Sequence, residues 1–177
     1  MAVEMIVILA FQSAYGYLYQ WIGLLIAAFM AGLAGGAFVV TRMLARIRKA
    51  VRVFCWLESL QLVFVLVSAW GLVALHGLFL EKTVMMEVPK VLLICMNVVA
   101  GFLVGSEFPL ANREVAATAK VGSSIVGGRF YALDLAGAWL GTLLVSVLLV
   151  PLVGISNTLL FIAALKACSL FLLYRSR

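Results

Sequence analysis

One stretch constrains the fold of this chain more than any other: residues 127–151 read GGRFYALDLAGAWLGTLLVSVLLVP. From Phe130 to Val150 it is apolar and long enough to cross the hydrocarbon core of a bilayer, which takes about 20 residues of helix. It nevertheless contains one acid, Asp134. Because a carboxylate is costly inside a membrane, Asp134 predicts either a functional site or a buried partner.

The neighbours of Asp134 at helical spacing form a small and polar face, whereas the opposite face carries Leu, Val and Trp139. The small and polar face contains Tyr131, Ala138, Gly141 and Val145, with Ala136, Gly137 and Thr142 beside it. Since small residues let a second helix approach closely, Gly137 and Gly141 are predicted to be helix-packing positions. Two interpretations are open: Asp134 pairs with a nearby base, or it belongs to a ligand or proton site.

The composition identifies the class of protein. The chain is 66% hydrophobic and only 11% charged, whereas a soluble domain is about 45–50% apolar and about 25% charged. We therefore expect a single transmembrane domain over residues 1–177, with the lipid bilayer as its surroundings. No cofactor or metal is expected, because the three cysteines lie in separate apolar runs without a metal-binding spacing and there is one histidine.

The apolar runs predict an all-α fold, a polytopic bundle of about six transmembrane helices. Glu4 stands where a signal peptide would carry positive charge, and no cleavage site follows, so we interpret the first run as a retained membrane helix. Pro109 is expected to end or kink the fourth helix. Pro151 and Gly154 predict a short turn before the last one. The expected helices cover residues 2–18, 21–40, 53–75, 91–108, 130–150 and 156–174.

The basic residues predict the orientation of this bundle. The segment at 41–52, TRMLARIRKAVR, is the most basic part of the chain and forms a short loop, which places it in the cytoplasm by the positive-inside rule. Ten of the 13 lysines and arginines then fall on the cytoplasmic side and two outside, and Lys166 lies within the membrane. Both termini are therefore expected to be cytoplasmic. The net charge of +6 is explained by these loops and does not predict nucleic-acid binding.

Four acids from four different helices are expected in, or at the edge of, the cytoplasmic half of the membrane. They are Glu4, Glu58, Glu107 and Asp134. Buried charges must be paired or solvated. One interpretation is a structural ion-pair network, in which Lys166 pairs with Asp134 or Glu58, and Glu107 pairs with Arg113 or Arg129. The other is a cytoplasm-facing acidic cavity that favours a small organic cation or protons.

Small residues on other helices also predict packing faces. Gly32 and Gly36 on the second helix, and Gly101 and Gly105 on the fourth, each have the spacing that permits close helix contact. His76 is interpreted as an interfacial residue without a ligand role. The chain contains no glycine-rich phosphate loop after a strand, no HExxH, no GxSxG and no nucleophile–base pair, so it is not predicted to be an enzyme.

Three stretches resemble the membrane-embedded, transporter-like module of spermidine-synthase-like integral membrane proteins. They are EMIVILAFQSAYGYLYQWIGLLIAAFMAGLAGG, GFLVGSEFPLA and YALDLAGAWLGTLLVSVLLVPLVG, and together they cover most of the chain. The resemblance implies a polytopic helical bundle in a bacterial-type inner membrane. Members of that family usually have further helices before the first stretch and often an aminopropyltransferase domain, so the chain is expected to match the C-terminal half of the membrane module. The polar residues that the resemblance singles out are Glu4, Gln12, Glu107, Pro109, Tyr131 and Asp134.

Two functions follow as hypotheses. The first is a non-catalytic subunit or module that anchors or scaffolds a larger membrane complex, with other membrane subunits or a second copy of the chain as partners; His76 with Met85 and Met86 could meet such a partner. The second is the binding or transport of a small organic cation (polyamine-like) or of protons. Its candidate site residues are Asp134, Glu58, Glu107, Gln61, Tyr131, Glu4, Gln12 and Lys166.

Overall fold

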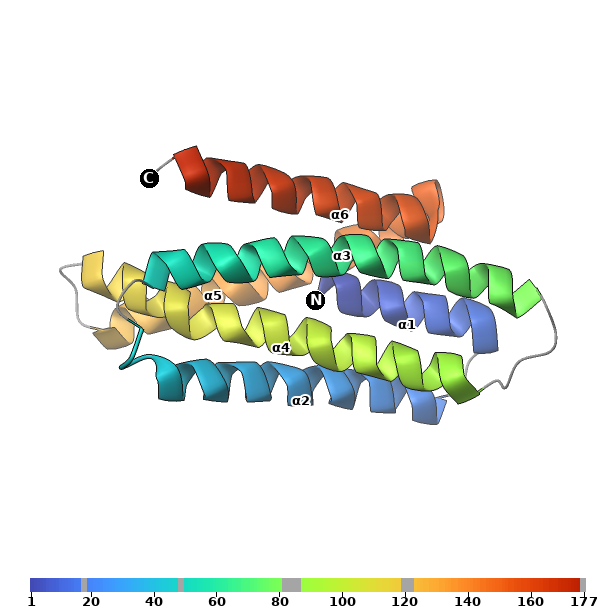
Figure 1. Ribbon diagram of the computed structural model, residues 1–177, viewed down its shortest axis with the longest axis horizontal. Helices are drawn as coiled ribbons and strands as arrows, with labels where there is room; N and C mark the ends of the chain where they lie inside the picture. The colour runs from blue at the N-terminus through green and yellow to red at the C-terminus, as the bar shows by residue number, and fades with distance from the viewer. Residues whose placement is uncertain (17–18, 48–49, 81–86, 119–122, 176–177) are drawn as a thin grey trace.

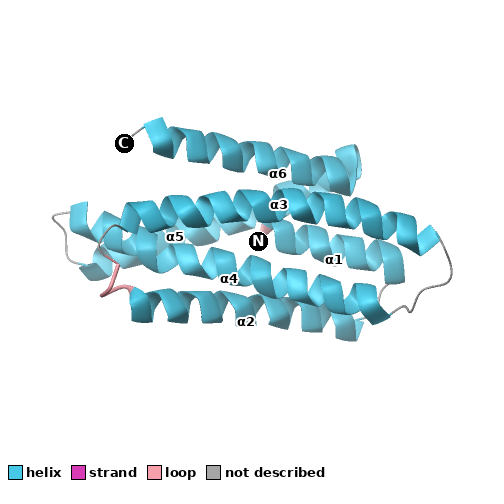
Figure 2. Cartoon of the chain, in the orientation of Figure 1, coloured by secondary structure: helices cyan, strands magenta, loops and turns pink. Residues whose placement is uncertain are grey.

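The computed structural model describes residues 1–16, 19–47, 50–80, 87–118 and 123–175 (Figure 1). Within these ranges the regular elements are all helical, which confirms the predicted all-α class (Figure 2). In the described part of the chain, four segments are long and apolar enough to cross a membrane, fewer than the six helices predicted, because residues 2–15 form a shorter helix and residues 127–175 form one continuous segment. The fold is that of a multi-pass membrane protein. The elements are α1 (Ala2–Tyr15), α2 (Tyr19–Met43), α3 (Ala50–Leu80), α4 (Glu87–Thr118), α5 (Ser123–Leu143), the π-helix η1 (Leu144–Leu149) and α6 (Val150–Arg175).

Most helices are longer than the apolar runs that predicted them, because their ends continue into polar sequence. α2 extends beyond residue 40 into the basic segment, where the Arg42 guanidinium lies 4.2 Å from the centre of the Phe38 ring. A basic side chain in the last turn also interacts favourably with the helix dipole. α1, by contrast, ends before its predicted limit, since Gly16 adopts a φ of 80°, which glycine accommodates without strain.

The prediction that the fourth helix ends near Pro109 is wrong. α4 contains Pro109 and continues to Thr118. Proline lacks a backbone donor, so one helical hydrogen bond to the residue four positions earlier is missing, and the proline ring crowds the carbonyl group of that residue. That residue is Gly105, and the neighbouring helix packs directly against it. Helices in membranes tolerate proline where neighbouring helices surround the site.

The last third of the chain forms two antiparallel passes. α5 continues through η1 into α6, and the helical backbone is interrupted at Gly154, which has a φ of 83° and a ψ of 168°. Figure 1 shows that α6 runs back along the bundle after this point. The turn predicted around Pro151 and Gly154 is therefore present, and its left-handed φ is a conformation that favours glycine.

The closest helix pair is α2 with α4, and glycines from both helices make it possible. A Cβ atom at Gly32 or Gly36 would overlap the carbonyl oxygen of Val98 or Phe102 on α4. A Cβ atom at Gly101 or Gly105 would overlap the carbonyl oxygen of Phe29 or Leu33 on α2. The two backbones are therefore in contact along both GxxxG patterns, as predicted for these four glycines.

A buried amide adds a hydrogen bond to the same helix pair. Asn97 of α4 is fully buried, and its Nδ2 donates to the Leu25 carbonyl oxygen of α2 at 2.9 Å. Where helices meet in a membrane, such a bond satisfies polar groups that lipid cannot. Asn97, Gly101 and Gly105 thus form one contact stripe.

The short helix α1 joins the two halves of the bundle. Ile6 packs in one core cluster with Val65 of α3, Val145 of η1 and residues of α6. Val7, Ile8 and Phe11 pack in a second cluster with Leu25 of α2 and Leu93 of α4. Figure 1 shows α1 running from the middle of the bundle, where Met1 lies, to one end.

The described basic residues near the helix ends separate along the bundle. The end of α2, the start of α3, the end of α4, the start of α5 and the end of α6 lie at one end of the bundle (Figure 1). This end carries Arg42, Arg52, Arg113, Arg129 and Arg175, whereas Lys90 stands near the start of α4 at the opposite end. The separation agrees with the pattern used to predict orientation; the cytoplasmic location of the basic end stays a prediction.

Candidate functional site

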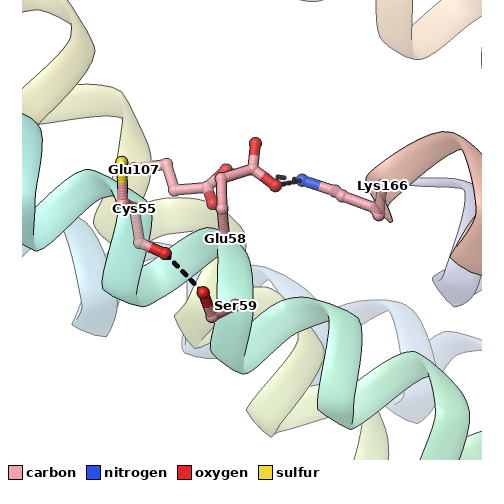
Figure 3. A network of polar contacts seen from close by, with 5 residues as sticks. All are labelled: Cys55, Glu58, Ser59, Glu107 and Lys166. Atoms are coloured by element: carbon pink, nitrogen blue, oxygen red, sulfur yellow. Dashed lines mark hydrogen bonds and ion pairs between the residues drawn. The ribbon is translucent and has the colours of Figure 1, made fainter. Parts of the chain in front are cut away.

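An ion pair between α3 and α6 is the centre of the candidate site (Figure 3). Lys166 Nζ lies 2.9 Å from Glu58 Oε2 and 3.9 Å from Glu107 Oε2. Glu58 stands eight residues after the first residue of α3, which is about 12 Å along the helix axis. Glu58 and Asp134 were the two partners predicted for Lys166. Glu58 of α3 makes the direct contact, whereas Asp134 lies on α5 and does not take part in this ion pair.

The acids of this cluster are well shielded from solvent, whereas the lysine is less so. The exposed fraction of the side chain is 7% for Glu58, 17% for Glu107 and 28% for Lys166. All three charges come from membrane-spanning helices. Because an isolated buried charge is costly, the contact with Lys166 explains how two carboxylates are accommodated here.

Two polar atoms beside the ion pair have no hydrogen-bond partner within the described ranges. They are Nε2 of Gln61 and Oε1 of Glu107, and both are buried. The Gln61 amide lies near enough to the Glu107 carboxyl to interact with it, but not in a well-formed hydrogen bond. Gln61 follows Glu58 by three residues, so the two side chains share one face of α3. Leaving a buried polar atom unsatisfied costs about 1–3 kcal/mol, so these atoms mark a place where a polar group fits.

A small cavity adjoins these atoms. Its volume is about 200 Å³, and it is lined by Gln61, Glu107 and Lys166 together with apolar side chains such as Phe64, Val65 and Leu103. Pockets for drug-sized ligands measure about 300–1,000 Å³. The cavity therefore suits a small molecule with one polar end and a short apolar body.

The charge of the cluster determines what the cavity attracts. Glu107 is the acid that lines the cavity, together with Lys166 and the Met1 amino group. A carboxylate in the low dielectric of a membrane-embedded site attracts a cation. Glu107 is the carboxylate available to it, because Glu58 holds the short contact with Lys166.

Other predicted site residues do not line this cavity. Asp134 and Tyr131 are exposed on α5, where the Tyr131 ring meets the Phe108 ring edge-on at 6.4 Å. Glu4 is buried and Gln12 is half-buried on α1. Glu4 and Asp134 lie within electrostatic reach of Met1, which does line the cavity. The four predicted acids thus divide into a pair at Lys166 and a pair near the start of α1.

The predicted pairing of Glu107 with Arg113 or Arg129 is wrong. Arg113 Nη1 donates to the backbone carbonyl oxygens of Leu44 at 2.6 Å and Ile47 at 2.9 Å, and Arg129 is exposed. The last carbonyls of a helix have no partner within the helix. Arg113 satisfies such groups just beyond the end of α2, and its charge is unavailable to Glu107.

Two of the predicted packing glycines have no packing role within the described part of the chain. A Cβ atom at Gly137 or Gly141 would meet no atom within 4 Å. Both residues lie on α5, which contacts the rest of the bundle much less than α4 does. The packing predicted for this face from its small residues is therefore not made within the chain.

The remaining features give no second site. His76 belongs to α3, whereas Met85 and Met86 fall outside the described residues. Among the described residues no group of three or more His, Cys, Asp or Glu side chains is placed to hold a metal ion. The walls contributed by Ala2, Val3 and Phe29 were not predicted, since apolar residues that line a cavity look like any other membrane-helix residues in sequence.

Comparisons with known proteins leave the function open. A scan against protein-family models finds no match to this chain, and neither the curated proteins nor the solved structures include one that matches it.

Proposed function

We propose that this chain is a membrane-embedded, non-catalytic module that binds a small organic cation in the cavity between α1, α3, α4 and α6. One observation carries the proposal: an ammonium group, that of Lys166, already lies between two carboxylates, and Glu107 keeps a buried oxygen without a partner. A ligand ammonium can approach that oxygen in the way that the lysine approaches Glu58. A small amine ligand, which the association of the resembled module with an aminopropyltransferase suggests, and a location in a bacterial-type inner membrane are consistent with this function.

Binding can be tested with n-butylamine on the full chain, purified and embedded in nanodiscs of neutral phospholipid. We expect saturable binding by calorimetry and a rise of the apparent Tm with amine concentration, because a ligand that binds the folded state stabilises it. Glu107→Gln should fold and lose this binding, since the Glu58–Lys166 contact is retained. Glu114→Gln, an acid on the same helix that does not line the cavity, is the matched control. Absence of binding to the unmodified chain up to millimolar amine would refute the proposal.

A second candidate function rests on the exposed surface of α5. Leu133 is 72% exposed and Trp139 is 62% exposed, and Gly137 and Gly141 have open space around them. Small residues flanked by large apolar ones allow another membrane helix to approach closely. This surface favours the role of a subunit that anchors or scaffolds a larger membrane complex, with a second copy or another membrane subunit as the partner.

The oligomeric state tests the second candidate. If α5 is an interface between copies, native mass spectrometry of the detergent-solubilised protein should detect an oligomer that Gly141→Leu disrupts. Gly23→Leu is the control, because Gly23 also has open space around it but lies on α2. A monomer in the unmodified protein, or an oligomer unaffected by Gly141→Leu, would count against self-association through this face.

A further inference from the structure

We infer that the groove between the start of α3 and the end of α6 binds an anionic phospholipid, with the lipid phosphate at Arg52 and part of an acyl chain along Leu170. The groove has a volume of about 390 Å³. It shares no lining residue with the amine cavity, so this site is separate from the one in the proposed function. Its lining consists of Arg52, Cys55, Trp56, Ser59, Leu170 and Tyr174.

The groove runs from the basic end of the bundle into the membrane-spanning part. Its α3 residues follow Arg52 by three, four and seven positions, so they lie on one side of that helix over about 10 Å. α6 runs back toward the end of the bundle where α3 starts (Figure 1). Tyr174 therefore lies near that end, and Leu170 lies one helical turn deeper.

The polarity of the groove changes along its length. The outer end has Arg52 and Tyr174, with Trp56 one turn further in, and Trp56 is 72% and Tyr174 78% exposed. Tryptophan and tyrosine side chains concentrate at the level of the lipid head groups. At the inner end, the Ser59 hydroxyl donates to the Cys55 carbonyl oxygen of its own helix at 2.8 Å (Figure 3), so its donor is already used. A ligand with a charged head and an apolar tail matches this order.

The charges around the outer end favour an anionic head group. Within the described ranges the Arg52 guanidinium has no ion-pair partner, and Glu58, the acid of α3, is held by Lys166. Arg52 also stands in the first turn of α3, where the helix dipole and free backbone N–H groups favour negative charge. The end of α6 brings the opposite pole of its own dipole, which Arg175 in the last turn offsets. Basic pockets between membrane helices bind anionic lipid head groups in this way.

Trp56 can report on the occupant of the groove. The full chain, with Trp21, Trp70 and Trp139 replaced by Phe, is placed in nanodiscs of neutral phosphatidylcholine. Fluorescence quenching is then compared for phosphatidylglycerol and phosphatidylcholine that are brominated near the head-group end of their acyl chains. We expect half-maximal quenching at a lower mole fraction of phosphatidylglycerol. Arg52→Met should raise that mole fraction by about fivefold, the effect of one basic residue near a membrane surface, and Arg52→Lys should keep the preference.

Two controls separate a lipid site from general attraction to the basic end. Arg129→Met removes the same charge from α5 at the same end of the bundle and should leave the preference unchanged. Soluble glycerol phosphate, which has the head-group charge and no acyl chain, should not reverse the quenching.

Three results would overturn the inference. The first is equal quenching of the unmodified protein by the two brominated lipids. The second is a preference for phosphatidylglycerol that Arg52→Met leaves intact, or that Arg129→Met weakens as much as Arg52→Met does. The third is displacement of the lipid by millimolar glycerol phosphate, which would indicate a site for soluble anions. Amine binding is measured separately, so none of these results bears on the proposed function.

Discussion

Lys166 on α6 and Glu58 on α3 are 108 residues apart in the sequence, yet their side chains meet at 2.9 Å. This contact ties the last helix to the body of the bundle. It lies within the membrane-spanning part of both helices. Lys166 also lines the cavity that contains Glu107 and Gln61.

The first prediction concerns the stability that this pair provides. Lys166→Met leaves Glu58 buried beside Glu107 without a counter-charge, so the free energy of unfolding should fall by about 1–3 kcal/mol, less than for a fully buried pair because Lys166 is partly exposed. Glu58→Gln with Lys166→Met should recover most of that loss. Thermal unfolding of the purified variants without amine gives the comparison. A double variant no more stable than Lys166→Met would show that the pair has no structural role.

The second prediction contrasts two glycines by the sign of the effect. Gly36→Ala should destabilise the fold by more than about 1 kcal/mol, because even a methyl group overlaps the Phe102 carbonyl and forces α2 and α4 apart. Gly141→Ala has open space and should be neutral or stabilise the helix by up to about 1 kcal/mol. Chemical unfolding of both variants measures the difference. Equal effects would contradict the close contact at Gly36.

The third prediction concerns the two hydrogen bonds from Arg113. Arg113→Met removes the donors to the Leu44 and Ile47 carbonyls and should loosen the residues that follow α2. Hydrogen exchange of residues 42–47 should then accelerate, while exchange in the middle of α2 stays unchanged. Arg129→Met is the control, since Arg129 is exposed at the same end of the bundle. Unchanged exchange at 42–47 would show that these bonds do not order the segment.

The fourth prediction concerns orientation. A cysteine in place of Ile47, near the basic end, should react with a membrane-impermeant maleimide only after the membrane is opened. A cysteine in place of Gln20, which is exposed at the opposite end of α2, should react in intact cells. The native Cys55, Cys95 and Cys168 are replaced beforehand, because two of them are exposed. Reaction of both positions from the same side would refute the proposed topology.

The elements that could be predicted from the sequence are those that depend on short-range pattern. Apolar runs of membrane length predicted helices, and the reversal at Gly154 was predicted from Pro151 and the glycine. The packing of Gly32, Gly36, Gly101 and Gly105 was also predicted, because glycines four positions apart leave one side of a helix free of side chains, so that a second helix can approach closely. The same reasoning predicted a packing role for Gly137 and Gly141, and there no atom of the described residues lies within 4 Å of where a Cβ atom would stand.

The sequence by itself determined that the chain crosses the membrane several times, that charges lie inside the apolar segments, and that Lys166 was a candidate partner for an acid. These follow from composition and periodicity, because an apolar helix partitions into lipid and a buried charge requires a partner. Only the tertiary structure decided that the acid is Glu58 and not Asp134, that Arg113 satisfies backbone carbonyls instead of Glu107, and that Gln61 faces a cavity. Those choices depend on how each helix is rotated and placed against its neighbours, and contacts between residues about a hundred positions apart leave no periodic signal in the sequence.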